Sequence, residues 1–429
     1  MTRLKPLVAL GVSVFALFSA PVRADAVTEW SALAVGCANR AGPTVLLDLA
    51  LVHAAMHDAI QAIEKRYKPY LAAPAADGTE SRAAAAAGAA RRVLSTVCPA
   101  TSQAALDTAL LPYVTGNDPG LAIGYAAGDT LLTKVRGTTT TLTPPSGTNP
   151  GEWRPTPPAN APMGFLYLAS TEPFVMTSPS QFRPGAPPAL SSQKYLREYN
   201  EVKEKGAVGS HPALGACPAP RDTDTARFWS GNFVAQWNQA ARDIALDRQL
   251  SIGDTARLLA LANLAMADAA IAVWDSKFHF NYWRPITAIQ VDDGIAATVQ
   301  DPGWTPFIQS GHFPAGSQNP PYPDYVSGAN GLTGAATTTL QLFFGTDWVP
   351  FEIYKATPAT VAICTNPRVY RRISDAAEEV VEARILLGIH FRTADVEARR
   401  LGTRVAVNTF ANALRPIGHG KDGHHDHDD

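Results

Sequence analysis

The pattern of apolar and polar positions predicts a chain built mainly of helices. Residues 43–63 are apolar nearly all round, which is typical of a helix that is buried on every side. Elsewhere apolar residues recur with helical spacing, and no set of segments alternates as strands do. We therefore predict an all-α fold of two fused helical bundles, with further helices over 81–97, 103–114, 121–135, 193–205, 223–247, 252–277, 326–344, 367–388 and 394–414.

Changes in composition divide the chain into segments. Residues 137–192 are rich in Thr, Pro, Gly and Ser, which predicts a long irregular connection of the kind that wraps a domain or carries function. We expect an N-terminal helical half over 27–136 and a second helical domain over 193–415, with a loop at 292–324. The His- and Asp-rich tail, 416–429, is expected to be disordered.

The first residues have the features of a secretory signal peptide, which we place at 1–26. Arg3 and Lys5 precede an apolar run over 7–18, and small residues such as Ala24 follow it. No later stretch is expected to reach the roughly 20 apolar residues of a membrane helix. The sequence therefore predicts an exported protein, periplasmic or extracellular, without a membrane span.

Charge and cysteine content narrow the class further. A formal net charge of −2 over 429 residues favours neither a nucleic-acid partner nor an anionic membrane surface. The cysteines, Cys37, Cys98, Cys217 and Cys364, are far apart and lack the short paired spacing of a zinc site. In an exported protein they predict up to two disulfides, and their pairing stays open.

The first candidate for chemistry is the block KFHFNYWRP, which contains Lys277 and Arg284. Seven residues, two helical turns, separate the two cations, so we expect them on nearly the same face, where both can reach one anion. The aromatic residues between them would exclude water and strengthen each charge. Pro285 indicates a bend directly after Arg284. The same spacing also describes an ordinary solvated helix face.

Two further blocks follow. In PPYPDYVSGANG, Ser327 and Gly328 begin a predicted helix, where a hydroxyl and free backbone amides make either an anion cradle or a simple helix cap. In ARILLGIHF, Arg384 and His390 are six residues apart and cannot share one helix face. We expect Gly388 to mark a change of direction that lets both reach the same pocket, although a lone histidine is often structural.

One histidine pair is expected to be structural. His53 and His57 lie four residues apart on the predicted buried helix, a spacing that can bind a metal. No third ligand stands near them.

Taken in order, the three blocks resemble the vanadium haloperoxidase and type 2 phosphatidic acid phosphatase superfamily, in particular its bacterial haloperoxidase-related branch. Residues 277–285 match K-x6-R-P, 323–328 resemble the part around P-S-G-H, and 384–390 match R-x5-H. The resemblance is strongest over 223–414. It extends more loosely into the first half, where HAAMHDAIQAIEKRYKPY and GEWRPTPP are similar to that branch.

The resemblance implies a role for each matched residue. Lys277, Arg284 and Arg384 would hold the oxygens of vanadate or phosphate, and Ser327 and the Gly328 amide would add hydrogen bonds. His390 would be the axial ligand of vanadate in a haloperoxidase, or the nucleophile that forms a phosphohistidine in a phosphatase. A haloperoxidase would use hydrogen peroxide, a halide and a small-molecule substrate.

One position departs from the family pattern. Ala329 stands where the family has a histidine that acts as general acid or base, a role worth roughly 10²- to 10⁴-fold in rate. His312, in the sequence Ser310-Gly311-His312, is our first candidate for a substitute acid, ahead of His279. Asp395 is expected to orient His390 from behind.

Three functions are therefore open. The favoured one is an exported vanadate-dependent haloperoxidase with altered proton transfer, because the aromatic first block and the long first half resemble that branch. The second is an acid phosphatase that acts on a phosphate monoester and needs no vanadate. The third is a non-catalytic oxyanion-binding relative. Nothing in the sequence fixes the oligomeric state.

Overall fold

Helices dominate the protein, as the sequence predicted. The computed structural model describes residues 25–38, 40–114, 116, 118–212, 217, 219–314, 316–355 and 363–418. The helices in this part of the chain are α1 (Ala26–Cys37), α2 (Val45–Glu64), α3 (Arg82–Val97), α4 (Ala100–Leu110), α5 (Gly120–Leu132), α6 (Gln193–Lys205), α7 (Arg221–Phe228), α8 (Phe233–Asp247), α9 (Ile252–Phe280), α10 (Pro285–Gln290), α11 (Gly328–Phe344), α12 (Ile373–Leu386) and α13 (Arg392–Asn412). Two short strands, β1 (Phe351–Ile353) and β2 (Arg368–Tyr370), pair antiparallel.

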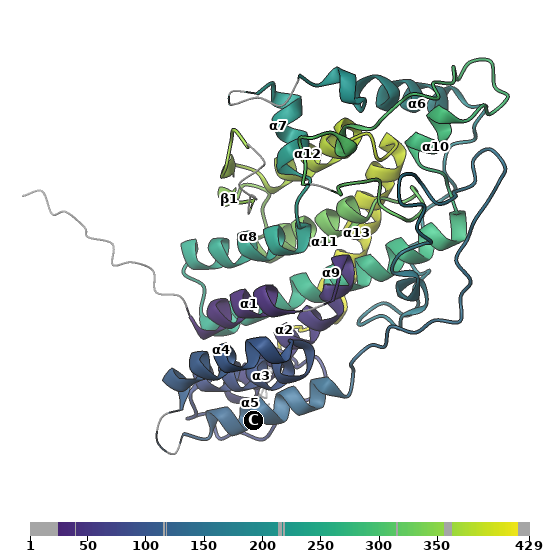
Figure 1. The fold of residues 1–429 in the computed structure, drawn as a ribbon. Helices are drawn as coiled ribbons and strands as arrows, with labels where there is room; N and C mark the ends of the chain where they lie inside the picture. The colour runs from purple at the N-terminus through teal and green to yellow at the C-terminus, as the bar shows by residue number, and fades with distance from the viewer. Residues whose placement is uncertain are drawn as a thin grey trace, which may run out of the picture.

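The helices form two groups that share one core. Helices α1 to α5 gather at one end of the molecule, and α6, α7, α10 and α12 lie at the other, with α8, α9, α11 and α13 between them (Figure 1). Helix α2 packs against α3, α5 and α9, and α9 packs in turn against α11 and α13. A continuous apolar cluster runs through these helices, so the two bundles are fused through α2 and α9.

Helix α9 is the central support of the fold. The Ser251 side chain accepts a hydrogen bond from the backbone N–H of Asp254 at its start, and Asn281 ends it in the left-handed conformation at φ 47°. By length and composition, α9 and the helical segment Gly42–Glu64 could each cross a membrane, contrary to our expectation that no such stretch follows the signal region. In each, the most apolar stretch of 18 residues is wholly buried within the protein, as in core helices.

Several elements differ from the sequence prediction. The helix expected over 223–247 is two helices, because Gly231 interrupts it and the Asn232 side chain caps α8. Helix α1 begins inside the expected signal region, since Ala26 is its first residue and Asp25 is its cap. Both strands span three residues, too few to show an alternating pattern.

The connection over 137–192 wraps the outside of α9. It has one short 3₁₀ helix, Leu166–Ser170. The carboxylate of Asp268, wholly buried in the middle of α9, accepts hydrogen bonds from the backbone N–H groups of residues 174–176 at 2.6 to 2.8 Å. The backbone N–H of Trp153 donates to the carbonyl of Asn281 at 2.8 Å. Through these bonds the irregular segment is fixed against the helix.

Disulfides and tail contacts fasten the rest of the described chain. Cys37 pairs with Cys98, and Cys217 pairs with Cys364, which settles the pairing that the sequence left open. The start of the expected disordered tail is attached, because Ile417 donates its backbone N–H to the Arg66 carbonyl at 3.0 Å. Residues 1–24 and 419–429, most of the predicted signal peptide and tail, lie outside the described residues.

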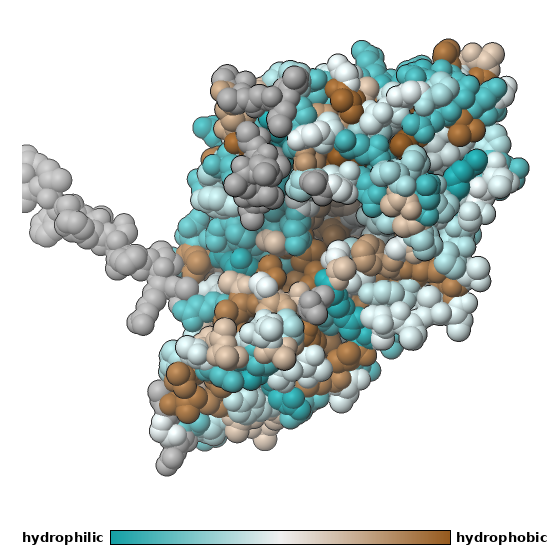
Figure 2. Space-filling view, viewed as in Figure 1, coloured by the Kyte–Doolittle hydropathy of each residue, from teal (hydrophilic) through white to brown (hydrophobic). Residues whose placement is uncertain are grey.

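The surface is mostly polar over the outer helices. The face seen in Figure 1 is hollowed near its middle, and apolar residues gather around the hollow (Figure 2).

Candidate functional site

Lys277 and Arg284 come together, but not along one helix. Helix α9 ends at Phe280, and Arg284 is the N-cap residue of α10. The prediction that the two cations lie two turns apart on one helix face was therefore wrong, because Asn281 reverses the chain between them. Both side chains are fully buried. The Tyr322 ring lies between them, with its centroid 4.9 Å from Lys277 Nζ and 5.0 Å from Arg284 Cζ.

The segment before α11 holds these cations through its backbone. Lys277 Nζ donates to the carbonyls of Pro323 at 2.6 Å and Asp324 at 3.0 Å. Arg284 Nε donates to the Tyr322 carbonyl at 2.8 Å. Ser327, fully buried, caps α11 by accepting from the backbone N–H of Asn330. The cations therefore converge near the N-terminal end of α11, where backbone amides and the positive end of the helix dipole favour an anion.

Gly388 turns the chain between Arg384 and His390, as the sequence predicted. Helix α12 ends at Leu386, Gly388 has φ +75°, and α13 begins at Arg392. A Cβ atom at position 388 would lie 2.4 Å from the Gly206 carbonyl oxygen, so only glycine fits.

His390 is held between a carboxylate and a cation. Its Nδ1 lies 2.7 Å from Asp324 Oδ1, and its Nε2 lies 3.3 Å from Arg284 Nη1. A guanidinium can only donate, so Nε2 accepts in this contact and Nδ1 is the place for the imidazole proton. The Nε2 lone pair thus faces the cations.

Burial and mutual repulsion shift the titration of the whole group. The pKa of Lys277 and of His390 lies well below its ordinary value, mainly because of burial and then because of the neighbouring Arg284. Burial also lowers the pKa of the Arg384 guanidinium. It raises the pKa of Asp324 to about 8 and that of Asp395 to about 7. Three basic groups, of which Arg384 is only partly buried, thus lie beside two carboxyl groups that resist ionisation.

The cation cluster has donors to spare. Arg284 Nη2 and Arg384 Nε are buried and lack a hydrogen-bond partner within the described protein. A buried donor without an acceptor costs about 1–3 kcal/mol, and more when it is charged. A tetrahedral oxyanion such as vanadate or phosphate would supply acceptors and balance the excess positive charge, so the residues present fit such a group.

Asp395 does not contact His390 as we expected. Its Oδ1 accepts from the side-chain amide of Asn330 at 2.8 Å, and its charge acts on Arg384. The carboxylate that holds His390 is Asp324, because the segment before α11 runs closer to the histidine than α13 does. Our sequence analysis did not give Asp324 this role. A usable signal existed, since Asp324 is the only carboxylate in residues 305–327.

The two candidates for a substitute acid lie elsewhere. His312 is buried, and its Nδ1 accepts from Arg227 Nε at 3.0 Å, while its ring lies against Phe307. His279 is exposed on the last turn of α9, with its ring against Phe280. The structure therefore does not bring either histidine to the cations.

A pocket of about 470 Å³ opens onto the cation cluster. Arg384 and Gly328 lie in its lining, together with Ala329. Its aromatic walls are Phe233, at the start of α8, and Trp274 and Tyr322. Arg384 Cζ lies 5.5 Å from the Phe233 ring centroid, so this cation connects the pocket with the buried cluster.

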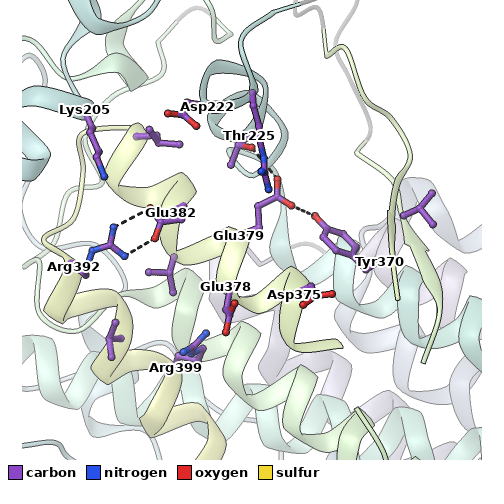
Figure 3. A pocket seen from close by; sticks show the side chains of 15 residues that line it. Lys205, Asp222, Thr225, Tyr370, Asp375, Glu378, Glu379, Glu382, Arg392 and Arg399 are labelled. Atoms are coloured by element: carbon purple, nitrogen blue, oxygen red, sulfur yellow. Dashed lines mark hydrogen bonds and ion pairs between the residues drawn. The ribbon is translucent and has the colours of Figure 1, made fainter. Parts of the chain in front are cut away.

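A larger hollow of about 830 Å³ lies elsewhere, beside α7, α12 and α13 (Figure 3). Two of the acidic groups that line it are paired with neighbours within the protein. Glu379 accepts from Thr225 and Tyr370, and Glu382 pairs with Arg392 at 2.6 Å. The Glu379 carboxylate thus links α12 to α7, and the Glu382 carboxylate links α12 to the start of α13.

The histidine pair of α2 belongs to the core. His53 and His57 are fully buried, and within the described residues no group of three or more His, Cys, Asp or Glu side chains could hold a metal ion.

Comparison with known proteins finds relatives in both sequence and fold. Residues 257–419 match the family described as the VCPO second helical-bundle domain. The vanadium chloroperoxidase of Curvularia inaequalis is 27% identical over 201 residues, which cover 42% of this chain and 32% of that protein. The chain thus aligns with about a third of the length of this curated relative.

Solved structures extend the likeness to nearly the whole fold. The first bacterial vanadium-dependent iodoperoxidase superposes with a TM-score of 0.73 at 24% identity, covering 92% of this chain and 96% of that one. A holo bacterial vanadium-dependent chloroperoxidase gives a TM-score of 0.67 at 18% identity, covering 87% and 92%. The protein has the helical fold of the vanadium haloperoxidases. Within that fold, residues 257–419 resemble the second helical bundle of the vanadium haloperoxidases.

Proposed function

We propose that this protein is a vanadate-dependent haloperoxidase that uses hydrogen peroxide to oxidise a halide. The observation that carries the proposal is the set of buried guanidinium N–H groups without acceptors, on Arg284 and Arg384, beside the Nε2 lone pair of His390. A site with spare donors, and with an imidazole nitrogen whose present contact with Arg284 Nη1 is long at 3.3 Å, suits an oxyanion that also accepts a bond from histidine.

Each residue has a stated part in this proposal. Lys277, Arg284 and Arg384 would hold the oxygens of vanadate. The Ser327 hydroxyl and the Gly328 amide would add hydrogen bonds, and His390 Nε2 would bind the vanadium. Asp324 would orient the imidazole. When bound there, vanadate supplies Lewis-acid activation of hydrogen peroxide for attack by the halide.

Proton delivery is the step in which this chain differs. Ala329 offers only a methyl group, and His312 is engaged with Arg227. We therefore assign proton delivery to solvent that enters through the pocket beside Ala329, and we expect slow turnover. Chain export is part of the same proposal, since the signal-like start and two disulfides suit an oxidising compartment.

The test is vanadate binding to the purified protein, followed by peroxide-dependent oxidation of iodide, bromide and chloride, each repeated with His390→Ala. Vanadate binding and halide oxidation that are both lost in the variant would support the proposal. Release of phosphate from an aryl phosphate without halide oxidation would establish the phosphatase function in its place. Vanadate binding without either activity would leave an oxyanion-binding protein.

A further inference from the structure

We propose that Glu198, on α6, is a positioning residue that determines where the His390 imidazole lies. Its effect on vanadate binding rests on the proposed function. Its effect on the imidazole of the vanadate-free protein does not, so the two effects can be tested separately.

Helix α6 presents one buried face to the protein. It lies at the outer end of the molecule and packs against α10 and α12 (Figure 1). Residues at helical spacing form the buried face: Tyr195, Glu198, Tyr199 and Val202. Glu198 is the charged residue of this face, and it is only 8% exposed. Burial of a carboxylate is costly unless the protein supplies hydrogen-bond donors, so the partners of Glu198 indicate its role.

The Glu198 carboxylate binds the first turn of α13 through both oxygens. The backbone N–H of Thr393 donates to Oε2 at 3.1 Å, and the Thr393 hydroxyl donates to Oε1. Phe391 occupies the N-cap position of α13, and its side chain has no polar atom that could cap the helix. Glu198 therefore caps α13 from another helix, and its negative charge suits the positive end of the α13 dipole.

The first turn of α13 supports two residues of the candidate site. His390 lies two residues before Arg392, the first residue of the helix. In the same turn, the Ala394 carbonyl accepts the backbone N–H of Ser327 at 3.0 Å. A displacement of this turn would therefore move the imidazole and the start of α11 together.

A second contact from the same face of α6 holds the residue next to His390. The Phe391 ring is buried, and its centroid lies 5.6 Å from that of Tyr195 on α6 and 6.1 Å from that of Tyr282. Buried aromatic rings packed at these distances leave little room for movement. The chain that follows His390 is thus fixed by ring packing at residue 391 and by hydrogen bonds at residue 393.

The His390 ring tolerates little displacement. Its Nδ1 lies 2.7 Å from Asp324 Oδ1, and a hydrogen bond weakens steeply as its angle departs from linear. Asp324 belongs to a different segment from Thr393, so a shift of the α13 start would not carry Asp324 with it. Loss of the Glu198 cap should therefore change the contact between His390 and Asp324, and with it the direction of the Nε2 lone pair.

Glu201 offers a contrast on the same helix. It binds Arg392, with Glu201 oxygens 2.7 Å from Nη2 and 2.9 Å from Nε, but through the side chain alone. Both residues are partly exposed, and Arg392 also pairs with Glu382. An exposed ion pair of this kind contributes little, and it does not hold the backbone of α13. Its loss should leave His390 in place.

The experiment follows the imidazole nitrogens of His390 by NMR of the vanadate-free protein, prepared with isotope-labelled histidine. His390→Ala assigns the signals by their loss. Glu198→Ala should shift both nitrogen signals. Glu198→Gln should return them close to their parent positions, because an amide can accept from the Thr393 N–H and donate to its hydroxyl. Glu201→Ala is the matched control, the same truncation on the same helix, and should leave the signals unchanged.

Vanadate affinity, measured by calorimetry, is the second readout. Glu198→Ala should lower it by about 10-fold or more, whereas Glu198→Gln and Glu201→Ala should stay within about threefold of the parent protein. Thermal unfolding of each variant separates a lost fold from a displaced ring. Should Glu198→Ala not fold, Thr393→Val removes only the hydroxyl donor, and it should shift the His390 signals in the same direction by a smaller amount.

His390 signals that shift in Glu198→Ala, return in Glu198→Gln and stay unchanged in Glu201→Ala support the proposal. Unchanged signals in a folded Glu198→Ala or Thr393→Val protein overturn it, and so does an equal shift in Glu201→Ala. If the signals shift as expected while the parent protein binds no vanadate, the proposed function fails and the positioning role of Glu198 stands.

Discussion

Two buried polar clusters on core helices differ in the charge of the groups that lack a hydrogen-bond partner. On α2, His53 Nδ1 lies 2.7 Å from the Leu49 carbonyl and its Nε2 lies 2.9 Å from Ser31 Oγ. Both oxygens of Asp58 on the same helix accept backbone N–H groups. At the start of α11, by contrast, buried guanidinium groups keep spare donors. Unused donors on charged groups, rather than burial, mark the second cluster as a ligand site. The atom without a partner in the α2 histidine pair, His57 Nδ1, belongs to a ring whose pKa burial lowers to about 4.

Perturbed titration does not separate the two clusters. Burial raises the pKa of Asp58 on α2 to about 7, and burial raises the pKa of Asp395 near the site to about 7 as well. Both shifts come first from loss of solvent. What differs is the surrounding charge, because Asp395 faces Arg384 while Asp58 faces backbone amides.

The largest expected effect comes from restoring the family's acid. Ala329→His places an imidazole beside Gly328, and halide oxidation should rise by about 10²-fold or more because a positioned acid replaces solvent. Steady-state rates of iodide oxidation at saturating vanadate check this. Rates that stay within twofold of the parent, with vanadate still bound, would mean that proton delivery does not limit turnover. Ala105→His, at an exposed position of α4, serves as the matched surface control.

Arg384→Gln tests whether the unpaired Arg384 donor binds an oxyanion. The change removes a charge that would hold the oxyanion, so turnover should fall by about 10²- to 10³-fold. Vanadate affinity, measured by calorimetry, should fall with it. Arg371→Gln, at an exposed position, makes the same chemical change without an effect. Equal vanadate affinities for Arg384→Gln and Arg371→Gln would mean that the cluster at the start of α11 is no more a ligand site than the cluster on α2.

Asp324→Asn probes the support behind the histidine. An amide oxygen can still accept the Nδ1 proton, but it lacks the charge that Asp324 carries above its pKa of about 8. Vanadate affinity at pH 9 should therefore fall by about 10- to 100-fold, as it does when an outer partner of a metal ligand is changed. Thermal unfolding checks that the fold is intact. The idea fails if vanadate affinity is unchanged in this variant while His390→Ala abolishes binding.

The smallest effect is expected on α2, and it concerns stability alone. Burial lowers the pKa of His53 to about 4, with a smaller contribution from Arg242. As pH falls from 6.5 toward 4, the unfolded chain takes up a proton that the folded chain does not, so stability is lost. His53→Gln should remove about 3 kcal/mol of that loss, at 1.36 kcal/mol per pH unit. Denaturant unfolding at pH 7 and pH 4 measures it. Activity at pH 7 should be unchanged.

The fold class and most of the candidate site could be predicted from the sequence because local pattern carries them. Helical spacing, the Ser251 cap and the Gly388 turn each depend on only a few neighbouring residues. The three matched blocks named the cations and His390, although the helix argument for Lys277 and Arg284 was wrong. Their convergence depends on the change of chain direction at Asn281, which is in the left-handed conformation. Residues other than glycine rarely adopt this conformation, so the sequence did not predict the turn.

The remainder depended on contacts between distant segments. Whether Asp324 or Asp395 meets His390 is decided by how the segment before α11 packs against the turn after α12. That His312 meets Arg227 is decided by α7, 85 residues earlier. The cysteine pairing likewise joins positions 61 and 147 residues apart. No local pattern contains these distances, and several pairings satisfy the same composition.

The wrapping connection also bears on how the protein is made. A ribosome delivers residues 137–192 before α9, yet the backbone amides of residues 174–176 have no Asp268 to bind until α9 emerges. The connection therefore stays exposed until α9 has formed, and it packs against that helix late in folding. Long-range contacts of this kind slow folding and lengthen the time during which apolar surface is open to aggregation. A protein assembled in this order would benefit most from a chaperone that binds residues 137–192 rather than the chain termini.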